Sequence, residues 1–312
     1  LATKPDWPHS ALNELAAWRM TLARDLQEFI RFAPRVPAAS GEDHVLLEEI
    51  TGPGPRWRHA FDVDSTAMFN YRLPLSALER VATSPSLPET LREEVGRAAW
   101  TRAVLLRDDA VAQRTFEFIE RAASSLKSDL IAYRSAKTAS QRQRAALFLL
   151  LKLPGLRPSV APGLGREPDR RSLKPVPEPV ADLDPLRDNW WCDAGEFSGL
   201  SSYRIYRDQS SPPPAVPWPA FLDDTTRTEA RGEDAQMEKL PTAPVILCDR
   251  TVEWAKAAPN DPRIPEALYL AIRSSHYGCW TKATTASSRA AFRLLKTRYA
   301  NTESAKKTKY YY

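Results

Sequence analysis

The chain has 312 residues, 43% of them hydrophobic, and a formal net charge of +5 at pH 7. This length suffices for one large or two medium hydrophobic cores, which excludes an extended unfolded tail. Its 27 prolines and 11 glycines are about twice and about half of the ordinary shares, a bias that favours helices with stiff connectors over a β-sandwich. Acidic residues accompany the basic ones, and the cluster Lys306–Lys309 is expected to be a solvated end, so no nucleic-acid partner is predicted.

The first predicted element is a long amphipathic helix. Apolar residues at spacings of three and four run from Leu12 through Trp18 to Phe29 and stop before Pro34. Between Pro34 and Arg72 the pattern weakens, and only a short helix over residues 43–50 is expected there.

Helical patterns then follow one another closely up to residue 153. The expected helices cover residues 74–82, 88–106, 108–124, 126–135 and 138–153. The apolar run Ala145–Leu151 predicts that the last of them is covered on several sides and lies at the centre of the N-terminal core.

Residues 154–219 are rich in proline and have no sustained period, which predicts an irregular connector. Trp190, Trp191, Tyr203 and Tyr206 are too aromatic for a free linker. These four side chains either anchor the connector on the helices or form an interaction patch for another protein.

Helical patterning resumes in the last third of the chain. The expected helices cover residues 220–240, 245–257, 265–277 and 288–299, with a short one from Glu303. Two segments of this part, Val252–Asn260 and Arg293–Asn301, can be laid over each other with a period of 41 residues.

The second of these segments, with Tyr299-Ala300-Asn301 before the small residue Ala305, resembles the tetratricopeptide-repeat units of bacterial envelope proteins. The resemblance covers about residues 243–310, Ala300 replaces the usual proline, and the extra length of the period is expected in a polar loop over Cys279–Ser287. It implies stacked antiparallel helical hairpins that bind other proteins.

An all-α fold in two units is therefore predicted. The N-terminal helical unit covers residues 1–153, the Pro-rich connector residues 154–219, and the tetratricopeptide-like unit residues 220–312. The function expected of such a chain is non-catalytic protein binding or scaffolding, as a free protein or as a subunit of a larger envelope or extracellular assembly.

The alternative function is a metal-dependent hydrolase with a dispersed site around Asp62 and Asp64, together with His59. Asp62-Val-Asp64-Ser-Thr66 has the spacing of haloacid-dehalogenase-type phosphatases, but no apolar strand precedes it. Asp108 and Asp109 open a predicted helix, where acidic residues stabilise the N-terminal dipole. No metal, haem or other cofactor is predicted.

The cysteines bear on the compartment. Cys248 lies near the start of one predicted helix and Cys279 just past the end of the next, so a hairpin would bring them to the same end. They either form a disulfide, if their Cα atoms come within about 7 Å, or remain separate buried thiols. A disulfide would indicate an oxidising compartment, and a periplasmic or extracellular location is favoured over the cytoplasm. Leu1 as first residue leaves open whether an export signal has been removed.

Overall fold

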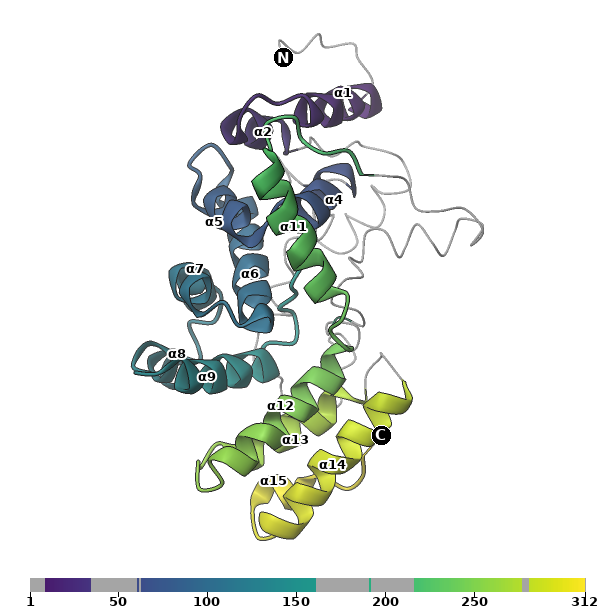
Figure 1. The fold of residues 1–312 in the computed structure, drawn as a ribbon. Helices are drawn as coiled ribbons and strands as arrows, with labels where there is room; N and C mark the ends of the chain where they lie inside the picture. The colour runs from purple at the N-terminus through teal and green to yellow at the C-terminus, as the bar shows by residue number, and fades with distance from the viewer. Residues whose placement is uncertain are drawn as a thin grey trace. The chain divides into compact units, whose positions relative to one another are not determined.

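The computed structural model describes residues 9–34, 61, 63–160, 191, 216–276 and 281–311, and every regular element in these ranges is an α-helix (Figure 1). The predicted all-α class is thereby confirmed. No helix within these ranges is both long enough and apolar enough to cross a membrane.

The chain divides into two compact units, and both are discontinuous in sequence. Unit 1 consists of Leu1–Gly96, Ser159–Glu167 and Phe197–Ala235, and unit 2 of Arg97–Pro158, Pro168–Glu196 and Gln236–Tyr312. These boundaries differ from the predicted ones at 1–153, 154–219 and 220–312. The division falls inside helix α6 (Glu89–Leu106), between Gly96 and Arg97.

Unit 1 begins with two helices where one was predicted. Helix α1 is His9–Thr21 and helix α2 is Leu26–Phe32. The predicted long helix is interrupted before α2 because the Asp25 side chain caps this second helix. Its Oδ1 accepts a hydrogen bond from the Glu28 N–H at 2.7 Å. The predicted apolar stripe is divided as well, since Phe29 is fully buried whereas Trp18 is 66% exposed.

Helix α4 (Val63–Arg72) was not predicted, and helix α5 (Leu75–Thr83) was. Helix α11 (Asp224–Met237), predicted within the C-terminal unit, belongs to unit 1 as far as Ala235. The aromatic rings of Phe29, Phe69 and Phe221 meet edge to face, with centroids 5.6 and 5.7 Å from Phe29.

Polar contacts link segments of unit 1 that are far apart in the sequence, and three of them involve residues 70–75. The Asn70 side chain donates to the Val160 carbonyl and accepts from the Val160 N–H, both at 2.9 Å. The Arg72 guanidinium donates twice to the Val216 carbonyl, at 2.8 and 2.6 Å. Glu233 on α11 accepts from the Leu75 N–H at 2.8 Å, which satisfies a free donor at the start of α5.

Unit 2 is centred on helix α9 (Ala139–Lys152), which packs against four helices. These are α7 (Asp109–Ala122), α8 (Lys127–Arg134), α12 (Ala243–Ala257) and α13 (Ile264–Ser274). Every residue from Ala145 to Leu151 is buried, as predicted. The expected place of this run was wrong, because it forms the core of unit 2 together with C-terminal helices rather than the core of an N-terminal unit.

Helices α12, α13, α14 (Lys282–Arg298) and α15 (Glu303–Lys307) form what we call the hairpin stack. Helix α12 packs against α13 and α14, and α13 also packs against α14 and α15 (Figure 1). Thr281 caps α14, so most of the loop predicted over Cys279–Ser287 is helical. The Tyr299 hydroxyl donates to the Pro259 carbonyl at 2.9 Å, which joins the two turns that the sequence overlay placed in register.

Candidate functional site

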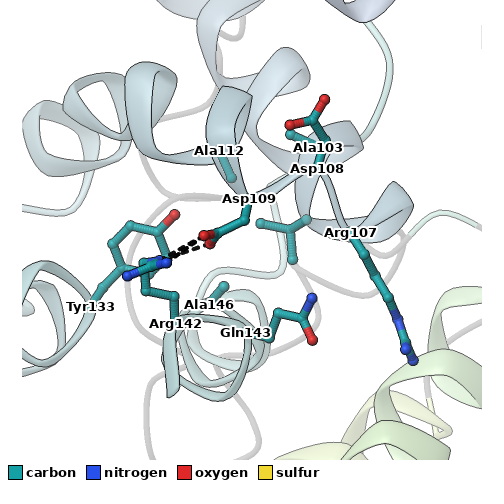
Figure 2. A pocket seen from close by; sticks show the side chains of 10 residues that line it. Ala103, Arg107, Asp108, Asp109, Ala112, Tyr133, Arg142, Gln143 and Ala146 are labelled. Atoms are coloured by element: carbon teal, nitrogen blue, oxygen red, sulfur yellow. Dashed lines mark hydrogen bonds and ion pairs between the residues drawn. The ribbon is translucent and has the colours of Figure 1, made fainter. Parts of the chain in front are cut away.

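A small hollow lies in unit 2 where α6 ends and α7 begins, facing α8 and α9 (Figure 2). Arg107, Asp109, Tyr133 and Arg142 are among the residues that line it. Its volume of about 10 Å³ is about what one ordered water needs. Ligand pockets are commonly about 300–1,000 Å³, so this hollow does not admit a substrate.

The turn above the hollow combines a helix end with a helix start. Arg107 has φ 63°, the left-handed conformation usually taken by glycine after a helix, and the Asp108 N–H donates to the Ala103 carbonyl at 2.9 Å. Asp108 then caps α7, with Oδ1 accepting from the Val111 N–H at 3.0 Å. The acidic pair therefore has the helix-opening position that the sequence predicted.

Asp109 is engaged by Arg142, and Figure 2 shows the two side chains joined across the hollow. The Arg142 Nε donates to both carboxylate oxygens of Asp109, at 2.8 and 3.0 Å, and Nη1 donates to the Ala136 carbonyl at 2.9 Å. The hydrogen bond to Asp109 raises the pKa of Arg142. This bidentate ion pair connects α7 to α9, so the charged residues that line the hollow hold the two helices together.

A second charged cluster connects α8, α9 and α13. The Lys152 ammonium lies 3.1 Å from Asp129 and 3.2 Å from Glu266, and 4.3 Å from the centre of the Phe148 ring. Through these two ion pairs Lys152, at the end of α9, joins this helix to α8 and to α13.

Of the residues proposed for a hydrolase, the structure describes Asp64 alone, and it is exposed in the first turn of α4. Asp62 and His59 lie outside the described residues. Within the described ranges, no group of three or more His, Cys, Asp or Glu side chains is arranged to hold a metal ion. The hydrolase alternative stays a prediction.

Trp191 is the described member of the predicted aromatic patch. Its side chain is buried, and its carbonyl accepts a hydrogen bond from the Ala243 N–H, at the start of α12, at 3.2 Å. This position supports an anchor rather than an exposed contact for Trp191. Trp190, Tyr203 and Tyr206 lie outside the described residues, so their role stays a prediction.

Cys248 is fully buried in α12, and its Sγ lies 3.2 Å from the Ala271 carbonyl oxygen on α13. Burial raises the pKa of this thiol above its ordinary value. Cys279 lies outside the described residues, so its pairing with Cys248 stays a prediction.

The sequence did not lead us to expect an ordered segment after α15. Thr308 is buried rather than solvated. The Tyr310 ring stacks on the His276 imidazole, with centroids 4.8 Å apart and planes 6° from parallel. The Tyr311 ring lies 5.3 Å from the Phe292 ring and 5.3 Å from the Arg289 guanidinium. The run of tyrosines at 310–312 was the available signal.

In comparisons with protein-family models, curated proteins and solved structures, nothing matches this chain.

Proposed function

We propose that this chain is a non-catalytic protein-binding protein of the helical-repeat type, which holds partner proteins on the surface of its hairpin stack. The observation that carries the proposal is the serial packing of this stack: α14 packs against both helices of the hairpin that precedes it. Hairpins that stack in series bury one face against each other and leave an extended surface for partners.

Two further features support this function. The Tyr299 to Pro259 hydrogen bond joins equivalent turns of successive hairpins, as expected if the hairpins repeat. The polar clusters in the described part of unit 2 have structural partners: Asp109 is bound by Arg142, and Asp129 by Lys152. These ion pairs join neighbouring helices of unit 2 and stabilise the scaffold that carries the proposed binding surface.

Photo-crosslinking in the native source tests the proposal. A photoreactive amino acid replaces Glu253 on α12 or Arg293 on α14, both exposed on the hairpin stack. The matched control position is Glu117, exposed on α7 of the same unit. We expect the same discrete crosslinked partner from both stack positions and not from Glu117. Equal background labelling at all three positions would contradict the proposal.

A further inference from the structure

We infer that His276, Arg289 and Phe292 form a docking strip for an extended partner segment with two adjacent aromatic residues, and that Thr308–Tyr311 occupies this strip as a displaceable strap. This inference rests on the proposed protein-binding function and names the partner's chemistry. The strap already shows what fits, since Tyr310 contacts His276 while Tyr311 contacts Arg289 and Phe292.

The strip contacts the strap from two sides. His276 follows the end of α13, whereas Arg289 and Phe292 belong to α14. Neighbouring side chains of an extended segment point in opposite directions, so adjacent rings can reach both helices at once. Two aromatic residues in sequence therefore satisfy the strip, and two aromatics separated by one residue would point to the same side.

The chemistry of the strip selects flat aromatic rings. The near-parallel stack at 6° requires a planar side chain over the imidazole of His276. A guanidinium at 5.3 Å from the Tyr311 ring adds a cation–π contact, for which tyrosine is better suited than an aliphatic side chain. The strip consequently favours a Tyr-Tyr or similar pair over a generic apolar peptide.

The strap is attached in a way that permits release. Both the N–H and the hydroxyl of Thr308 donate to the Ser304 carbonyl, so these bonds lie within the end of α15 and not on the strip. Tyr310 and Tyr311 reach the strip through ring contacts, which are individually weak. Tyr310 also remains 63% exposed, so a competing ring can approach the same place.

Covalent connection compensates for this weak attachment. A short link gives the strap a local concentration of about a millimolar at the strip. An external segment with the same contacts binds the intact chain only when it overcomes that local concentration. Removal of the strap's rings should therefore uncover a binding activity that the intact chain hides.

The test uses the full chain with Tyr310→Ala and Tyr311→Ala combined. The probe is a fluorescent synthetic peptide with the sequence of residues 306–311, followed by fluorescence anisotropy. We expect a Kd of about 0.1 mM or lower for the double variant. Competition from a strap at a local concentration of about 1 mM should then weaken binding to the intact chain at least about tenfold. Adding Arg289→Ala and Phe292→Ala to the double variant should weaken binding again by at least about tenfold, because the strip itself is then removed.

The control peptide has the same composition with its tyrosines separated by one residue, and it should bind at least about tenfold more weakly. Circular dichroism checks that the double variant keeps its helices. If it does not, Tyr310→Ala alone serves, since that ring is largely exposed, with a smaller gain in peptide binding expected. Equal binding by the intact chain and the folded variant, or by both peptides, would overturn the inference.

A second copy of the chain is the competing occupant. A mass that doubles with concentration for the intact chain, but not for the double variant, would show exchange of straps between copies and overturn the assignment to a partner. Peptide binding probes the strip alone, whereas crosslinking probes native partners anywhere on the stack. Crosslinks at Glu253 and Arg293 without peptide binding would therefore remove the strip and leave the proposed function.

Discussion

In unit 1 the helices are tied to irregular chain, whereas in the hairpin stack of unit 2 helices pack directly on helices. Asn70 and Arg72 on α4 hold the backbones of Val160 and Val216. Helix α12 is instead enclosed by α13 and α14, with residues such as Leu247 and Ala255 fully buried.

The difference follows from backbone hydrogen bonding. A helix satisfies most of its own N–H and C=O groups, so apolar side chains suffice to join it to another helix. Irregular chain brings unsatisfied groups into the interior, and each needs a polar partner. Where irregular chain packs into unit 1, this unit therefore depends on specific polar side chains, whereas the helix-on-helix core of unit 2 depends on the volume and apolarity of many side chains. The predictions below test this contrast.

The largest effect is expected in the apolar core of unit 2. Leu149 is fully buried in α9, so Leu149→Asp places an unpaired charge there, at a cost on the order of several kcal/mol. We expect the variant not to fold, as measured by circular dichroism and soluble yield. Leu149→Met keeps volume and apolarity and is the control. A soluble variant with the original helical content would contradict this account of the core.

A smaller loss of stability is expected when the hydrogen bonds between Asn70 and the Val160 backbone, the polar clamp of unit 1, are removed. Asn70→Ala removes both partners of the buried Val160 backbone, and each orphaned group costs about 1–3 kcal/mol. Urea unfolding should show a loss of about 2–6 kcal/mol, the sum for the two groups. The control is Thr83→Ala, whose exposed hydroxyl bonds only to carbonyls of its own helix. If the two variants lose equal stability, unit 1 does not depend on its clamp.

The smallest effect concerns pH in the hairpin stack. Burial, and then the nearby Arg273, lowers the pKa of His276, so the folded chain favours the neutral imidazole on which Tyr310 stacks. The unfolded histidine titrates near about 6.5 and binds more protons as the pH falls below that value. Stability should therefore decrease below about pH 6.5 and level off below the folded pKa.

His276→Gln isolates this contribution, because it removes the titrating group and leaves the carboxylates unchanged. The urea midpoint of the parent chain should fall more between pH 7.5 and pH 5.5 than that of the variant. Parallel curves for the two proteins would show that His276 does not titrate differently on folding.

The sequence predicted those helices whose apolar face and end signals both lie within the helical segment itself. Helices α5 to α9 have nearly the predicted bounds because their apolar faces and end signals are local. The break at Asp25 was readable from the spacing of Asp25 and Glu28, but the apolar period continues across it and favoured a single helix. Helix α4 was missed because it buries Ser65, Thr66 and Asn70, polar residues that look solvated in the sequence.

The docking strip was harder to predict, because its residues come from separate elements of the chain. The run of tyrosines that ends the printed sequence is visible, but its partners His276 and Phe292 come from other elements. The discontinuous units were not predictable either, since Leu75 and Glu233 are 158 residues apart. Contacts of this kind join segments that are far apart in the sequence, and the local spacing of apolar residues does not indicate which segments will meet.

The long sequence distance between contacting residues also delays the folding of unit 1 during synthesis. At roughly 5–20 residues per second on the ribosome, the 158 residues between Leu75 and Glu233 take about 8–30 s to appear. Throughout that interval α5 has been made but lacks the carboxylate that completes its first turn. A nascent chain that stalls before Glu233 would carry an unfinished unit 1, with its apolar face open to chaperones or to aggregation.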